Sequence, residues 1–178
     1  MKTITSPFIT RTRRLAALSI TCFALGFAGV QTGAAQRPDT GGSTHEKSLL
    51  MSFNENFTSN STLDGDVTLT GAIGIRGTRH EDFAVLHVNH DGSEVVVGGT
   101  STITAGGGTI TTQFVGTIYF DLATFDATQL AYVKGVESVT GGTGAYAGVT
   151  SHEGAFTATI DYDTGGVIGM FEAKVRMP

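Results

Sequence analysis

Cysteine and tryptophan are almost missing from this chain. The only cysteine, Cys22, lies in an apolar stretch near the N-terminus, and there is no tryptophan. Without a cysteine in the rest of the chain, neither a disulfide framework nor a cysteine-ligated metal site can form. The lack of tryptophan disfavours a lectin that stacks sugars on indole rings. The folded part must therefore be stabilised by its core and its strand pairing.

Basic residues are scarce beyond the N-terminus. Four of the 11 Lys and Arg lie in the first 35 residues, whereas all 16 Asp and Glu follow, so the remainder carries a formal charge of −9 (7 minus 16). This balance argues against binding to nucleic acid or to an anionic membrane surface.

Residues 1–35 have the pattern of a secretory signal peptide. Lys2 and three arginines precede an apolar stretch from Leu15 to Val30, and Gly33-Ala34-Ala35 offers small residues for cleavage before Gln36. We therefore expect a secreted or periplasmic protein without stable membrane insertion. The Arg13-Arg14 pair leaves the twin-arginine export route open. The alternative is a retained N-terminal anchor helix.

No helical periodicity is convincing after Lys47. Residues 36–46 are rich in Pro, Gly, Ser and Thr and predict a flexible leader, and 47–178 predict one β domain. Alternating apolar residues and turn signals predict eight strands at about 49–57, 67–77, 81–89, 94–104, 109–120, 130–140, 150–161 and 167–177. One short helical turn is expected within 121–129.

The predicted strands are even in number and mostly joined in sequence by tight turns, which are expected at 63–66, 90–93, 105–108 and 163–166. These features favour an all-β, eight-stranded antiparallel up-and-down barrel, which closes its own edges. Such a barrel has room for side chains or one small ligand. A two-sheet sandwich is the alternative.

Familiar catalytic and metal-binding motifs are lacking. No Gly-x-Ser-x-Gly nucleophile turn precedes a helix. The five His residues show no ligand spacing. The sequence predicts no metal site and no cofactor.

A glycine-rich segment, 139–148, reads Val-Thr-Gly-Gly-Thr-Gly-Ala-Tyr-Ala-Gly. A phosphate loop would lead into a helix and end in Gly-Lys-Ser/Thr, whereas an alternating strand pattern follows here. The pattern Thr-Gly-Gly-x-Gly-x-Tyr-x-Gly before a strand resembles that of allene oxide cyclase-like and dirigent barrels. The segment Ser52-Phe53-Asn54-Glu55 is similar to the first strand of the plant cyclases.

This resemblance implies an eight-stranded barrel that binds a small hydrophobic molecule and steers a cyclisation or isomerisation without a cofactor. Catalysis in such a barrel rests mainly on positioning the substrate. The alternative is a non-catalytic secreted barrel that acts as a carrier or as an envelope or interaction module. The sequence leaves open whether the protein is an enzyme.

Glu55 is the candidate catalytic residue. It occupies the apolar face of the first strand, between Phe53 and Phe57, which are candidate ligand-binding residues. A carboxyl group buried there would have a raised pKa and suit a general acid or an electrostatic stabiliser. The alternative is a solvated residue at the barrel rim.

His87, Tyr119 and Tyr132 are further candidates for ligand binding, because their polar groups lie within predicted strands. The inward face around His87 cannot be assigned, and a surface or structural role is the alternative. For the two tyrosines the alternative is packing with a solvated hydroxyl group.

Some predicted strands are apolar on both faces. In the last strand, Val167, Phe171 and Val175 oppose Ile168 and Met170. A barrel has one interior, so an apolar outer wall predicts a homodimer or homotrimer. A leader or loop that covers this wall within one chain is the alternative.

Overall fold

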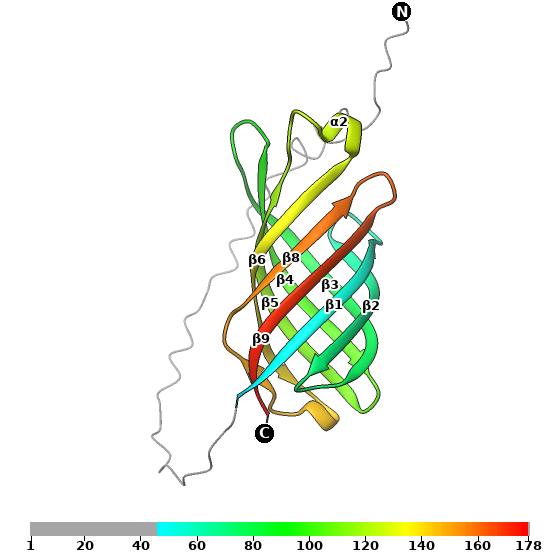
Figure 1. Ribbon diagram of the computed structural model, residues 1–178, viewed down its shortest axis with the longest axis vertical. Coiled ribbons are helices and arrows are strands. Elements are labelled where there is room, and N and C mark those ends of the chain that lie inside the picture. Colours follow the sequence, from blue (N-terminus) through cyan, green and yellow to red (C-terminus); the bar gives the residue numbers. More distant parts are fainter. Residues whose placement is uncertain (1–45, 178) are drawn as a thin grey trace, which may run out of the picture. The chain divides into compact units, whose positions relative to one another are not determined.

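The computed structural model describes residues 46–177, which form a closed antiparallel β-barrel of eight long strands (Figure 1). The predicted fold class is confirmed. The predicted signal peptide, 1–35, and all but the last residue of the predicted leader, 36–46, lie outside the described residues. No helix within the described range is long and apolar enough to span a membrane.

The strands follow one another around the barrel in chain order. They are β1 (Lys47–Phe57), β2 (Thr62–Gly71), β3 (Ile75–Val88), β4 (Glu94–Ala105), β5 (Gly108–Tyr119), β6 (Leu130–Gly142), β8 (Gly154–Asp161) and β9 (Gly166–Arg176). Each pairs with the next, and β1 pairs with β9 along nearly its whole length, from Lys47↔Val175 to Asn56↔Gly166. This last pairing closes the barrel, so neither terminal strand has a free edge.

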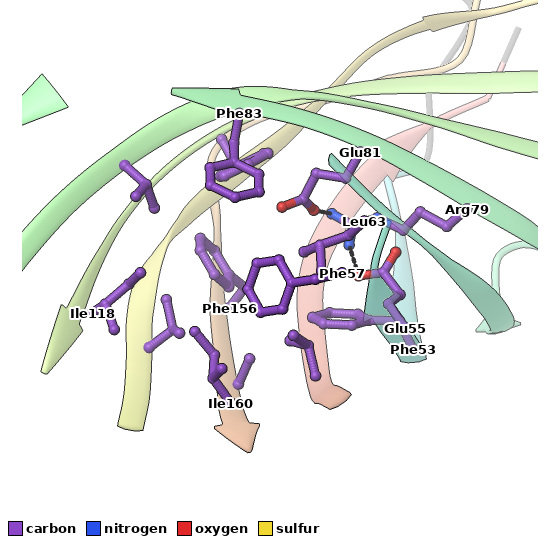
Figure 2. A pocket seen from close by; sticks show the side chains of 15 residues that line it. Phe53, Glu55, Phe57, Leu63, Arg79, Glu81, Phe83, Ile118, Phe156 and Ile160 are labelled. Carbon is purple, nitrogen blue, oxygen red and sulfur yellow. Dashed lines mark hydrogen bonds and ion pairs between the residues drawn. The ribbon is translucent and has the colours of Figure 1, made fainter. Parts of the chain in front are cut away.

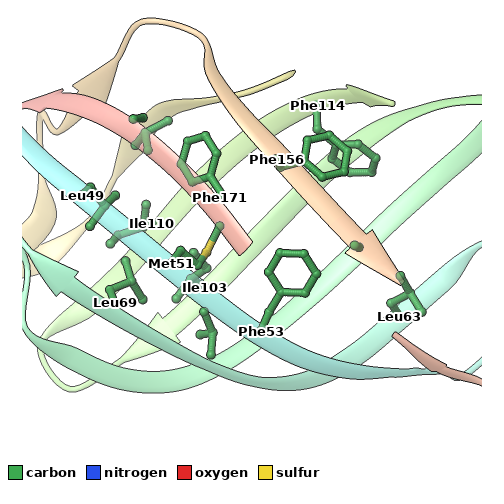
Figure 3. Close-up of a cluster of buried hydrophobic side chains, with 14 of the residues drawn as sticks. Leu49, Met51, Phe53, Leu63, Leu69, Ile103, Ile110, Phe114, Phe156 and Phe171 are labelled. Atoms are coloured by element: carbon green, nitrogen blue, oxygen red, sulfur yellow. The ribbon is translucent and has the colours of Figure 1, made fainter. Parts of the chain in front are cut away.

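The period-2 pattern of the sequence decides which side chains fill the interior. In β1, Leu49, Met51, Phe53 and Glu55 are buried, whereas the residues between them are exposed. The half of the barrel away from α2 (Phe125–Thr128) is packed solidly with aliphatic side chains and Phe171 (Figure 3). The cavity described below lies toward the other end.

An aromatic cluster lies at the end of the barrel near α2. Phe125 of α2 packs edge-on against Phe120 and Tyr162, with ring centroids 5.1 and 5.7 Å apart. Tyr162 in turn stacks on Phe57 at 6.3 Å, and Phe57 meets Phe83 at 6.1 Å. We call these five residues the aromatic cap.

One predicted turn is wrong. Residues 63–66 were expected to turn, but they belong to β2, and the chain turns after Gly71, whose φ is +89°. Gly65 has another reason to be glycine: a Cβ there would overlap the backbone of Asn54 and Glu55 on the paired strand. Close approach of two strands, rather than a turn, explains this glycine.

A second difference concerns the segment 150–161. It was expected to form one strand, but it is divided into β7 (Thr150–Ser151), which pairs with the end of β9, and β8. The short helix η1 (Gly144–Tyr146) lies in the glycine-rich segment just before β7. The other expected turns, around Gly92, Gly107 and Gly165, are confirmed, and each of these glycines has a positive φ.

Candidate functional site

A cavity lies inside the barrel between the solid half and the aromatic cap. It measures about 50 Å³, counted as the space open to the centre of a water-sized sphere. Its walls are aliphatic and aromatic, with five phenylalanines: Phe53, Phe57, Phe83, Phe114 and Phe156. Three charged side chains, Glu55, Arg79 and Glu81, join them on one side (Figure 2). The site is thus an apolar chamber with one charged wall.

Glycines in neighbouring strands make room for one of these rings. Gly116 of β5 and Gly135 of β6 are cross-strand partners. A Cβ on either would meet the ring of Phe156, at 2.7 Å from its Cζ in the case of Gly116. The ring therefore lies in a notch in the barrel wall and packs edge-on against Phe114, at 5.9 Å.

Arg79 of β3 is the centre of the charged wall. Its side chain is 2% exposed and contacts three carboxylates: Nη1 donates to Glu55 at 2.9 Å, Nη2 donates to Glu137 at 3.2 Å, and Nη2 forms an ion pair with Glu81 at 2.8 Å. The guanidinium also lies 4.7 Å from the centre of the Phe53 ring. One cation thus links carboxylates from β1, β3 and β6.

Two hydroxyl groups extend this network across β4 and β5. The Nε of Arg79 donates to Ser101 Oγ at 3.0 Å, and the Ser101 and Thr112 hydroxyls are 2.7 Å apart. Thr112 donates to Oε1 of Glu137. Because Ser101 accepts from Arg79 and Thr112 donates to Glu137, the Ser101 hydroxyl donates to Thr112. All hydrogen bonds along this path therefore run in one direction.

Burial changes the protonation of the carboxyl groups. It raises the pKa of Glu55 and raises that of Glu81 to about 7, although the attraction of Arg79 opposes both shifts. Burial acts to lower the pKa of Arg79, but the carboxylates of Glu137, Glu81 and Glu55 outweigh it and raise that pKa. At neutral pH the wall thus combines a permanent cation with carboxyl groups that can hold or release protons.

Two oxygen atoms in this network have no partner. Glu55 Oε1 and Glu137 Oε2 are buried, and neither makes a hydrogen bond within the described part of the protein. Glu55 lines the cavity, whereas Glu137 does not. A buried polar atom without a partner costs free energy, so Glu55 Oε1 is the atom that a bound molecule would satisfy.

The structure brings together three of the predicted site residues and separates three. Phe53, Glu55 and Phe57 line the cavity. His87 is exposed near the end of β3, beyond a bulge between Val85 and His87. The assignment of His87 to a ligand cavity is therefore corrected: the bulge and the rim position take its side chain into solvent.

The prediction that Tyr119 and Tyr132 bind a ligand inside the barrel is corrected as well. They are 39% and 53% exposed, and they face each other across β5 and β6 on the outer wall. Their inward neighbours are Ile118 and Val133, which both line the cavity. Strand parity places the two hydroxyl groups outside.

Arg79, Glu81 and Glu137 were not predicted to be site residues. The misplaced turn excluded Arg79 from any strand, so its parity with Glu81 and Phe83 was lost. In β3 as observed, these three residues alternate on the inner face. Glu137 shares its parity with Val133 and Val139 of β6, and this alternation was the available signal.

No group of three or more His, Cys, Asp or Glu residues between 46 and 177 is placed to hold a metal ion. No protein-family model matches the chain, and no curated protein matches it. What can be said of function therefore rests on the cavity and its charged wall.

Proposed function

We propose that the protein is a binding barrel for a small hydrophobic molecule, and that this molecule occupies the cavity with a polar group toward Glu55. The observation that carries the proposal is a space walled by five phenylalanine rings and lined by Glu55, whose Oε1 makes no hydrogen bond within the described residues. Sites for small molecules combine a mostly apolar wall with a few placed polar groups in this way.

The cavity is small. Pockets that enclose a drug-sized molecule measure about 300–1,000 Å³, whereas the space here of about 50 Å³ suits a few water molecules or a group of similar size. A larger ligand would require the aromatic cap to move, because Phe57 and Phe83 belong both to the cap and to the cavity wall.

The resemblance to allene oxide cyclase-like and dirigent barrels extends this proposal to chemistry. Glu55 would act as the acid or electrostatic stabiliser in a cofactor-free cyclisation or isomerisation, supported by its raised pKa and its place on the cavity wall. The small cavity favours a second candidate function, a non-catalytic carrier or an envelope or interaction module. In either case we propose a secreted or periplasmic protein.

Binding is tested by NMR titration of the protein with 1-butanol, which is small enough for the observed cavity. We expect shift changes centred on the amides of the cavity-lining residues. Ala158→Leu fills the cavity and should abolish these changes, because Ala158 is 9% exposed and lines the space. Ala155→Leu, on the outer face of the same strand, is the matched control and should keep them. An absence of shifts in the parent, or shifts that survive Ala158→Leu, would overturn the proposal.

Glu55→Gln tests the role of the carboxyl group. The substitution is nearly isosteric and removes a charge that is costly to bury, so the fold should persist and thermal stability should stay level or rise. Ligand affinity, or turnover of a substrate once one is known, should change. Unchanged ligand handling would show that Glu55 has no part in the site.

A further inference from the structure

The buried charges in and around the charged wall do not balance. Between residues 46 and 177 the buried charged side chains are Glu55, Arg79, Glu81 and Glu137, which is one cation for three carboxyl groups. Arg79 already contacts all three. The interior therefore has either protons on its carboxyl groups or room for a second positive charge.

Two of the three buried carboxyl groups, those of Glu55 and Glu81, belong to residues that line the cavity. Of the two unpartnered carboxyl oxygens, Glu55 Oε1 belongs to a residue with 0% exposure that lines the cavity. Glu81 lines it as well, and its carboxyl group lies on the same side in Figure 2. A cation bound in the cavity would therefore lie on a wall that has two carboxyl groups for the single guanidinium of Arg79.

The aromatic walls suit the same kind of ligand. The faces of aromatic rings attract cations, and alkylated ammonium groups are recognised by clusters of such rings. Five phenylalanines line this cavity, and Phe53 already has the guanidinium of Arg79 at 4.7 Å from its ring centre. A carboxylate ligand would instead face the excess negative charge.

We propose that the polar group bound in this cavity is a protonated amine, so that the ligand is a small apolar amine with its ammonium toward Glu55 and Glu81. This inference rests on the proposed function and specifies the chemical class of its ligand. The space of about 50 Å³ admits a short alkylammonium, and a longer apolar tail would extend toward the aromatic cap.

The carboxyl groups around the cavity provide an independent readout. Burial raises the pKa of Glu81 to about 7 and also raises that of Glu55. Arg79 opposes both shifts, Glu137 adds to both, and Asp64 of β2 adds to that of Glu55. An ammonium beside them favours their ionised forms, so binding should release protons. Affinity should therefore rise, on the order of tenfold, between pH 5.5 and 7.5.

The test is calorimetric titration of the protein with butylammonium, 1-butanol and butyrate, which share one carbon chain. We expect butylammonium to bind at least tenfold more tightly than 1-butanol at pH 7.5, and butyrate to give no binding. Titrations of butylammonium in two buffers of different ionisation enthalpy should show net proton release near pH 7. Equal affinity for butylammonium and 1-butanol would overturn the amine inference and leave the proposed function intact. If none of the three binds, both fail.

Two variants test whether the carboxyl group of Glu55 contacts the ammonium group directly. Glu55→Gln should weaken butylammonium at least tenfold and change the affinity for 1-butanol by much less. Glu137→Gln removes the same buried charge outside the cavity lining and is the matched control, with a smaller loss. Equal losses in the two variants would contradict direct contact with Glu55. Circular dichroism checks that each variant folds, and if Glu55→Gln does not, the proton release of the parent protein decides the question.

Discussion

Arg79 and its three carboxyl partners are a costly arrangement for a barrel interior. Replacing a buried ion-pair network with well-packed apolar residues is often neutral or stabilising, so such a network is weak support for a purely structural role. The other inward positions of this barrel show that apolar packing was available. A role for the charged wall in ligand handling is consistent with its position beside the interior cavity.

The protonation of Glu81 has a consequence for stability. Its folded pKa of about 7 lies above the ordinary 4.5, so the folded state keeps a proton that the unfolded chain releases between these values. The resulting stability is fully present below about pH 4.5 and is lost as the pH rises through about 7, with a slope of up to about 1.4 kcal/mol per pH unit.

Glu81→Gln should therefore flatten the pH dependence of stability. We expect the variant to match the parent near pH 4.5 and to exceed it at pH 8, by on the order of 2–3 kcal/mol, in urea unfolding experiments. Glu172→Gln, on the outer face of β9, is the control. The exposed His80–Asp64 pair titrates in both proteins and cancels in the comparison. Equal slopes for Glu81→Gln and the parent would mean that Glu81 is ionised in the folded state at neutral pH.

Of the three residues of the charged wall, the sequence predicted Glu55 and missed Arg79 and Glu81. Glu55 could be found because it stands between two phenylalanines in an unambiguous alternating strand. Arg79 could not, because it fell between the predicted strands 67–77 and 81–89, and Glu81 could not, because the inner face of the strand that it opened was not assigned. The first error came from reading Asp64-Gly65 as a turn, and only the paired strand shows why Gly65 is needed.

In β5 and β6, two glycines leave the space that a neighbouring aromatic ring fills. Gly116 and Gly135 form the notch that receives the ring of Phe156, and nothing in the sequence of either strand alone identifies the ring that fills it. The pairing of these two glycines and the inward position of Phe156 on β8 are known only from the folded structure.

Gly135→Ala should destabilise the protein. Its Cβ would overlap the Phe156 ring and the carbonyl oxygen of Val115, so we expect a loss of about 1–3 kcal/mol in urea unfolding, typical of overpacking. Butanol binding should weaken as well, because Phe156 must move at the cavity wall. Gly74→Ala is the control: it has no atom within 4 Å and should change stability by less than about 0.5 kcal/mol. A stable Gly135→Ala variant would show that the ring is not held in the notch.

For the whole molecule, strand number, order and the barrel class were predictable because alternation and tight turns repeat along the chain. The division of 150–161 into β7 and β8 was not, because it shows only in the pairing: Thr150 and Ser151 pair with the end of β9, whereas β8 pairs with both β6 and β9. The inner face was assigned correctly where only one side of a strand is apolar. It could not be assigned near His87, where both sides are apolar.

The outer wall leads to a prediction about assembly. Val115 and Val136 are cross-strand partners, as are Tyr119 and Tyr132, and all four are exposed on β5 and β6. Exposed apolar side chains next to one another are typical of association surfaces. We expect a homodimer or homotrimer by light scattering at tens of micromolar, and Val136→Lys should shift it to monomer.

The control for this prediction is Leu50→Lys, which adds the same charge to an exposed apolar position on β1. It should leave the assembly unchanged if β5 and β6 form the contact. A monomer mass for the parent protein would overturn the expected oligomer.

The pairing of β1 with β9 also means that the first and last strands of the barrel lie side by side, with Lys47 opposite Val175. A short peptide could join them covalently, and new ends could then be opened in an exposed hairpin turn such as the one at Gly92, whose Cβ position faces open space. The circularly permuted chain would keep every strand neighbour. The same barrel could therefore be formed by chains whose termini lie between other pairs of neighbouring strands.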